Sequence, residues 1–172
     1  EMIVNKNFKI KNEAKVELVK ALALCSGHTG IAGGQYLDLN FEKKRKNFSD
    51  ILNMQKKKTG KLFNFCCFAA GVVAKKKNNE LKSLSRLGED IGLLFQLADD
   101  FIDIKGSKKI AGKSTKKDQK KGKSTLISLI GYKKTHAFAF KLKKNILRKL
   151  SKHGKKANDL INIVEFILER NF

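Results

Sequence analysis

Three aspartates and a glutamine lie close together in the segment FQLADDFID, residues 95–103. These residues are Gln96, Asp99, Asp100 and Asp103. An α-helix would place all four side chains on one face, because the last three follow the first by three, four and seven positions. Carboxylates this close repel one another and lose hydration when they are partly buried. Mg²⁺ would relieve both costs, and it typically binds one or two carboxylates together with phosphate oxygens of a substrate.

The segment 82–104 lies within the helix that would carry these carboxylates. Its opposite side is apolar from Leu84 to Ile102, so we expect the helix to pack through that side and to direct its carboxylates into a cavity. A plainer interpretation is a solvated acidic face that pairs with some of the many lysines. The aspartates alone leave both interpretations open.

A strongly basic stretch follows the carboxylates directly. Residues 105–123 hold nine lysines, interspersed with glycine and serine, and one acid, Asp118. A mobile cationic loop beside a metal cluster would neutralise a diphosphate and exclude water. The composition by itself favours a flexible solvated linker, which is the alternative.

Two GKST tetrapeptides, at residues 112–115 and 122–125, invite comparison with a P-loop. The first glycine of that motif is missing, because Ser107 and Lys117 occupy the required positions. A P-loop also follows a buried strand, whereas the preceding segment here has helical periodicity. The P-loop interpretation therefore fails on spacing and on context.

Four motifs in a fixed order cover much of the chain. They are GGQYLDL at residues 33–39, KTGKL at 58–62, GLLFQLADDFIDI at 92–104, and GK with KDQKKGKST at 112–125. Through them the chain resembles the C-terminal half of short-chain trans-polyprenyl diphosphate synthases of the bacterial farnesyl diphosphate synthase type. The resemblance extends over nearly all of the 172 residues. It implies an all-α fold, a helical bundle of the isoprenoid synthase type in which residues 1–172 form one domain portion and residues 105–123 a flexible basic active-site loop.

The resemblance also implies a role for each matching residue. The metal ligands, for Mg²⁺, would be Asp99, Asp100, Asp103 and Asp118. The residues in contact with the allylic diphosphate would be Lys58, Lys113 and Lys123. The residues that line the carbocation and leaving-group region would be Lys58, Thr59 and Gln96. Each of these side chains taken singly could be an ordinary surface or core residue, and only the joint pattern assigns the roles.

The chemistry of such an enzyme explains why these residue types are needed. An allylic diphosphate, dimethylallyl or geranyl, ionises to an allyl cation and a diphosphate anion, so metal ions and lysines must stabilise the leaving group. The Thr59 hydroxyl and the Gln96 carbonyl would steady the cation. Isopentenyl diphosphate then adds to the cation, and proton loss completes the prenyl transfer.

The chain departs from the family pattern in one respect. The first aspartate-rich motif and the N-terminal basic residues that bind isopentenyl diphosphate are absent. We therefore expect a fragment of a longer enzyme, inactive alone and homodimeric when complete. The motif that sets product length is also absent, so farnesyl is an expectation by resemblance only. A non-catalytic subunit of a prenyl diphosphate synthase is a second hypothesis.

A net charge of +22 supports a third hypothesis, a basic helical protein that binds polyanions. Only four of the 38 basic residues are arginine, whereas base reading favours arginine, and the lysines are spread along the whole chain. We therefore expect no nucleic-acid partner. Cys25, Cys66 and Cys67 lack metal-ligand spacing and are expected to be reduced core residues.

The absence of proline and the long periodic segments predict a wholly helical chain. The expected helices span residues 12–25, 28–39, 47–59, 61–76, 78–104, 124–131, 132–152 and 156–170. The apolar run at residues 62–74 is too short to span a bilayer and is expected to be a buried helix. With no signal peptide or membrane span, the default location is cytoplasmic.

Overall fold

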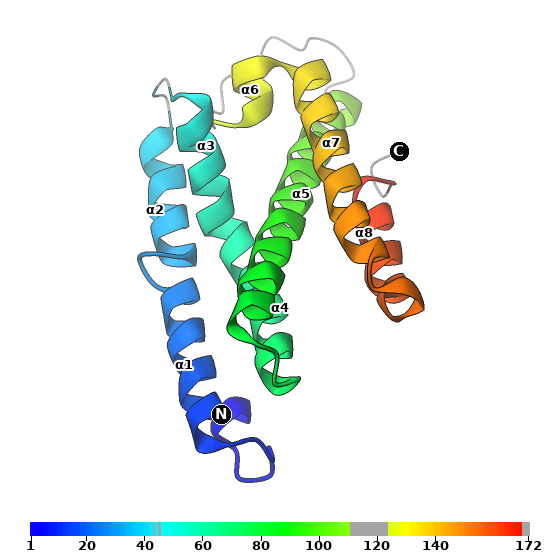
Figure 1. Ribbon diagram of the computed structural model, residues 1–172. Helices are drawn as coiled ribbons and strands as arrows, with labels where there is room; N and C mark the ends of the chain where they lie inside the picture. The colour runs from blue at the N-terminus through cyan, green and yellow to red at the C-terminus, as the bar shows by residue number, and fades with distance from the viewer. Residues whose placement is uncertain (43, 45, 111–123, 170–172) are drawn as a thin grey trace.

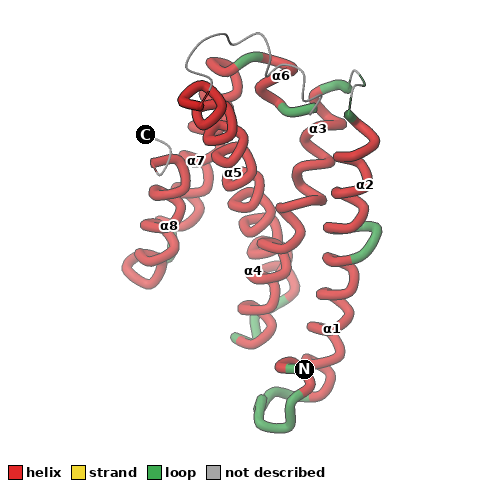
Figure 2. The backbone as a smooth tube through the Cα atoms, turned by 180° about the vertical axis from the view of Figure 1, so that it is seen from behind, coloured by secondary structure: helices red, strands yellow, loops and turns green. Residues whose placement is uncertain are grey.

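The computed structural model describes residues 1–42, 44, 46–110 and 124–169, and every regular element within them is helical (Figures 1 and 2). The predicted all-α fold is confirmed. Of the predicted site residues, Lys113, Asp118 and Lys123 lie outside the described residues. The same is true of most of the predicted basic loop, and the single-domain prediction stays a prediction.

The helices follow the expected order closely. Their bounds are η1 Met2–Val4, α1 Asn12–Ser26, α2 Ile31–Phe41, α3 Phe48–Gln55, the π-helical segment η2 Lys56–Gly60, α4 Lys61–Val73, α5 Asn78–Ile110, α6 Leu126–Ile130, α7 Tyr132–Ser151, η4 Gly154–Ala157 and α8 Asn158–Glu169. The largest difference from expectation is at α5, which continues six residues beyond the predicted end at 104. The basic stretch therefore begins as helix rather than as loop.

Helix α5 runs through the middle of the molecule (Figure 1). It packs against η2 and α4 on one side and against α7 and α8 on the other. Helices α1 and α2 follow one another along the outer edge beyond α3 and α4, as both views show (Figures 1 and 2). This arrangement places η2, α4, α7 and α8 around α5, whereas α2 packs against η2 and α3.

The start of α3 is fixed by its sequence. The Asn47 side-chain oxygen accepts a hydrogen bond from the Asp50 amide at 2.9 Å, and the Asp50 carboxylate accepts one from the Asn47 amide at 3.3 Å. This reciprocal arrangement is a capping box, which satisfies two amides that the first turn of a helix leaves unpaired. Helix α6 begins with the same arrangement between Thr125 and Ser128.

The main hydrophobic core forms around α5. Buried side chains of α5 from Leu87 to Phe101 pack with residues of α3, α6, α7 and α8, among them Ile51, Leu126, Ile146 and Val164. A smaller cluster of Leu18, Val72 and Leu81 joins α1, α4 and the start of α5. Among the described residues, no helix is long and apolar enough to cross a membrane.

Helix α4 is less buried than its apolar sequence predicts. Leu62 and Val73 are 47% and 45% exposed, and Cys66 is exposed as well. The expectation that all three cysteines are core residues is therefore wrong for Cys66, while Cys25 and Cys67 are half-buried free thiols. Burial raises the pKa of the Cys67 thiol, as it does for Cys25.

Candidate active site

A π-helical segment connects α3 to α4 without a break. Sequence reasoning placed a break at Gly60, but this residue has helical angles, φ −57° and ψ −35°, and the helix continues from Phe48 to Val73. Such π segments inside α-helices are frequent at functional sites because the wider turn redirects side chains. The segment contains Lys58 and Thr59, two of the predicted site residues.

Glycines bring the neighbouring helices close to this segment. A Cβ atom added to Gly34 of α2 would lie 2.2 Å from the Lys58 amide nitrogen, and one added to Gly92 of α5 would lie 2.8 Å from the Gly60 Cα atom. Any larger residue at these positions would push the helices apart. The close approach allows short side chains on η2 and α5 to reach one another.

A chain of three hydrogen bonds connects η2 and the end of α3 to α5. The Thr59 hydroxyl donates to Gln96 Oε1 at 2.7 Å, and Gln96 Nε2 donates to Asp100 Oδ1 at 3.1 Å. Gln55 Nε2 donates to the other carboxylate oxygen, Asp100 Oδ2, at 2.8 Å. The structure thus brings together Thr59, Gln96 and Asp100, and it adds Gln55, which sequence reasoning missed. Below, these four residues are called the polar chain.

Asp100 lies inside the bundle and is only 8% exposed. The pKa of its carboxyl is raised to about 6, mainly because the group is buried and in smaller part because of the negative charges of Asp103 and Asp99. The hydrogen bonds from Gln96 and Gln55 act in the opposite direction, because they stabilise the ionised form. Asp100 therefore differs from the solvent-facing carboxylates with which the sequence grouped it.

Asp99 and Asp103 remain closer to solvent on the same helix. Asp99 is half-buried and Asp103 is exposed, and their spacing of four residues places them one above the other. Among the described residues, Asp103 forms no ion pair, and no cluster of three or more His, Cys, Asp or Glu side chains could hold a metal. Two carboxylates one turn apart are a donor set that suits Mg²⁺, which needs only one or two from the protein.

Lys58 is held by a neighbour that the site prediction did not include. Its ammonium group forms a part-buried ion pair with the Asp38 carboxylate of α2. The sequence signal for this pair is that Asp38 follows Gly34 by four residues within GGQYLDL. Both residues therefore lie on the face of α2 that contacts η2. Lys56 and Lys61 pair instead with Glu89 of α5, at 3.7 and 3.0 Å.

A cavity of about 300 Å³ lies along α2. It is lined by His28, Ala32, Gly33, Tyr36, Leu37 and Lys57, and its walls are mainly apolar. Lys57 is its basic side chain, one residue before Lys58.

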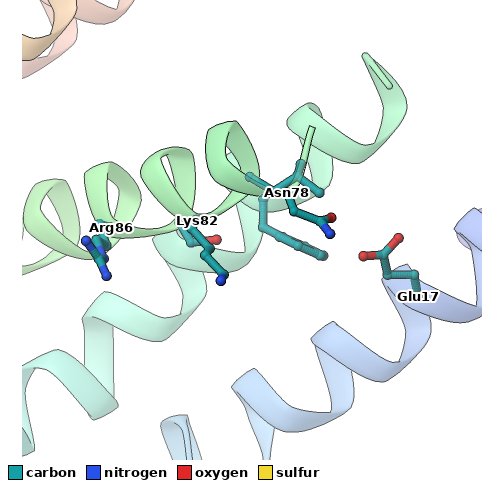
Figure 3. Close-up of a pocket in the computed structure, with 7 residues that line it drawn as sticks. Glu17, Asn78, Lys82 and Arg86 are labelled. Atoms are coloured by element: carbon teal, nitrogen blue, oxygen red, sulfur yellow. The ribbon is translucent and has the colours of Figure 1, made fainter. Parts of the chain in front are cut away.

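A second cavity of about 330 Å³ lies between α1, α4 and α5 and includes no residue of the polar chain. Figure 3 shows Lys82 and Arg86 along one side of α5, while Glu17 approaches from α1 near Asn78. Phe68, Leu81 and Ser85 complete the wall. All three of these charged side chains are exposed, so this cavity is an open surface pocket rather than a buried site.

The model of one protein family, polyprenyl synthetase, matches residues 2–164. The chain belongs to the polyprenyl synthetase family. Similar relatives include the dimethylallyltranstransferase of Fischerella ambigua, 31% identical over 171 residues that are 99% of this chain and 49% of that protein. The farnesyl diphosphate synthase of Escherichia coli is 29% identical over 167 residues, which are 95% of this chain and 56% of the relative.

Solved structures agree with this membership. An FPP/GFPP synthase from Zymomonas mobilis superposes with a TM-score of 0.81 at 30% identity, covering 96% of this chain and 55% of that one. A geranyltransferase from Helicobacter pylori gives a TM-score of 0.75 at 26% identity, covering 96% and 54%. The isoprenoid synthase bundle expected from the motifs is confirmed. This polyprenyl synthetase chain spans about half the length of the curated relatives it matches.

Proposed function

We propose that this chain is the C-terminal half of the active site of a Mg²⁺-dependent prenyltransferase of isoprenoid biosynthesis. The complete protein would condense an allylic diphosphate, dimethylallyl or geranyl, with isopentenyl diphosphate. The observation that carries the proposal is the hydrogen bond from Thr59 to Gln96 beside the Asp99–Asp103 pair. It places two neutral dipoles next to two carboxylates, which is the combination that ionisation of an allylic diphosphate requires.

Mg²⁺ would be held by Asp99 and Asp103, with Asp118 as a further proposed ligand. When bound, the ion supplies positive charge to the diphosphate leaving group. Asp99 and Asp103 suit this task because both are less buried than Asp100 and share one helix face. Asp100 differs from them, because both of its carboxylate oxygens accept hydrogen bonds within the protein.

The chain's own residues would prepare the allylic substrate. Thr59 and Gln96 present oxygen atoms that lower the energy of a positive charge without forming a bond to it. Lys58, held beside them by Asp38, would contact the diphosphate. Lys113 and Lys123 are proposed to cover further phosphate oxygens. The apolar cavity along α2 would receive the hydrocarbon part of the substrate.

The names of the relatives support the substrate class, since they are diphosphate synthases or transferases of prenyl groups. We also propose, from the family resemblance, that the complete protein is a homodimer.

Calorimetric titration with inorganic diphosphate, with and without Mg²⁺, tests the proposal. We expect Mg²⁺-dependent binding that Asp103→Asn weakens at least about tenfold, roughly 1.4 kcal/mol of binding free energy. Asp159→Asn, an equal change of charge at an exposed position of α8, is the matched control and should leave the affinity unchanged. Binding that ignores both the metal and Asp103→Asn would contradict the proposal and favour a general polyanion binder.

A further inference from the structure

Gln55 is the most unusual polar residue of the described chain. It is 2% exposed, and its Oε1 atom is buried without a hydrogen-bond partner. An unpartnered buried carbonyl oxygen destabilises a fold, so packing alone would favour an apolar side chain at this position. Its other amide atom, Nε2, donates to Asp100 Oδ2. This hydrogen bond gives a reason for a glutamine in the core.

The carboxylate of Asp100 fixes the direction of every hydrogen bond in the polar chain. An ionised carboxylate only accepts, so the Gln96 group that faces it must be the NH₂ group. The Gln96 carbonyl oxygen then faces Thr59, and the Thr59 hydroxyl must donate its single proton to it. Because this proton is already used, the Thr59 Oγ1 atom presents only lone pairs to any other group.

We propose that Asp100 and Gln55 are positioning residues, which orient the Gln96 amide and the Thr59 hydroxyl so that oxygen lone pairs face the positive charge of the ionising substrate. This role rests on the proposed prenyltransferase function and assigns Asp100 no contact with metal. Gln55 holds one carboxylate oxygen and Gln96 the other, so Asp100 cannot turn toward Asp99 and Asp103 without breaking a buried hydrogen bond.

The experiment compares two probes that differ in positive charge. Inorganic diphosphate with Mg²⁺ reports the metal and phosphate site, whereas an ammonium analogue of a prenyl diphosphate adds a cation where the substrate would develop one. We expect Asp100→Leu to keep the Mg²⁺-dependent affinity for inorganic diphosphate within about twofold. The same substitution should reduce about tenfold the ratio of the affinity for the ammonium analogue to the affinity for inorganic diphosphate, because the Gln96 amide loses its fixed direction. We call this ratio the preference for the ammonium analogue.

A conservative variant should restore the preference. In Asp100→Asn, the new carbonyl oxygen can accept from Gln96, and the new NH₂ group can donate to Gln55 once the Gln55 amide turns over. The turn uses the Gln55 oxygen that has no partner in the native protein. We therefore expect near-native preference for the ammonium analogue in Asp100→Asn, although its negative charge is gone.

Gln55→Leu is the second variant, because an apolar side chain suits the buried position. It should fold, as circular dichroism would verify, and should lower the preference for the ammonium analogue about threefold by loosening Asp100. A loss of Mg²⁺-dependent diphosphate binding in Asp100→Asn, like that expected in Asp103→Asn, would overturn the positioning role. An unchanged analogue preference in both Asp100→Leu and Gln55→Leu would do the same.

The wild-type titration separates this inference from the proposed function. A wild-type chain that binds diphosphate without regard to Mg²⁺ contradicts the prenyltransferase proposal itself. Mg²⁺ dependence in the wild type together with an unaltered preference in the variants contradicts only the positioning role.

Discussion

The two sides of helix α5 use different chemistry. The side toward η2 carries Glu89, Gly92, Gln96 and Asp100, a glycine and three polar residues at helical spacing. The side toward α7 is largely apolar. Here the centroid of the Phe101 ring lies 5.1 Å from that of the Tyr132 ring, and an ion pair joins Asp90 to Lys149 at 2.8 Å.

We interpret this difference as a division of roles within α5, in which the apolar side serves folding and the polar side serves the proposed site. Burial of apolar surface toward α7 and α8 favours folding, at roughly 25 cal/mol for each Å² removed from water. The polar side must offset the desolvation of a buried carboxylate and of two amides, and it contains an unpartnered oxygen. We therefore expect the polar side to contribute mainly geometry to the proposed site, and the buried apolar residues of the core to contribute the larger share of the stability.

The largest expected effect is on the apolar side. Ile146 of α7 is fully buried against the core, so Ile146→Ala should lower the free energy of unfolding by about 2–5 kcal/mol through lost burial and a residual cavity. Ile163→Ala, the same substitution at a position 55% exposed on α8, should cost about 1 kcal/mol or less. Urea denaturation followed by circular dichroism measures both. Equal losses would contradict the view that the apolar core carries the stability.

A smaller loss of stability is expected from a substitution where α5 contacts η2. Alanine is about 0.8–1 kcal/mol more favourable than glycine inside a helix, yet Gly92→Ala should destabilise the chain by about 1–3 kcal/mol. The reason is the Cβ position, 2.8 Å from Gly60 Cα and 3.0 Å from Phe63 Cδ2. Ser83→Ala, at an exposed position of the same helix, is the control and should be neutral or slightly stabilising. A stabilising Gly92→Ala would show that the two helices do not touch there.

The smallest expected loss of stability comes from removing an ion pair, and we compare a pair near η2 with a pair between α5 and α7. Asp38→Asn should cost about 1 kcal/mol, because the Asp38–Lys58 pair is part-buried, with side chains 18% and 32% exposed. Asp90→Asn removes the same charge from a more exposed pair with Lys149 and should cost about 0.5 kcal/mol or less. Denaturation at low and high salt measures both, and salt should reduce the Asp90 effect more. A larger loss for Asp90→Asn would reverse the ranking of the two pairs.

Much of the fold could be predicted because the signals are local. The helical periodicity of the apolar residues gave the helix order, and the capping residues Asn47 and Thr125 mark two helix starts. The extent of α5 was underestimated, since glycine, serine and lysine after Ile104 are typical of a loop in isolation. The break expected at Gly60 was wrong because glycine in a helix is tolerated where another backbone comes close, here at Gly92.

The candidate site was predictable in its residue types but not in its connections. The spacing of Gln96, Asp99, Asp100 and Asp103 indicated a shared helix face. It did not reveal that Asp100 points into the core while Asp103 is exposed. Gln55 carried no recognisable signal, because its partner lies 45 residues away and the contact depends on how α3 and α5 pack.

The sequence by itself determined the helical class, the order of the helices, the family and the residue types available for chemistry, because periodicity and motif spacing are properties of neighbouring residues. The tertiary structure alone decided which carboxylate is buried, which lysine is paired and which glutamine completes the polar chain. Those outcomes depend on close approach between helices distant in sequence, and that approach sets the solvation and the hydrogen-bond partners of each side chain.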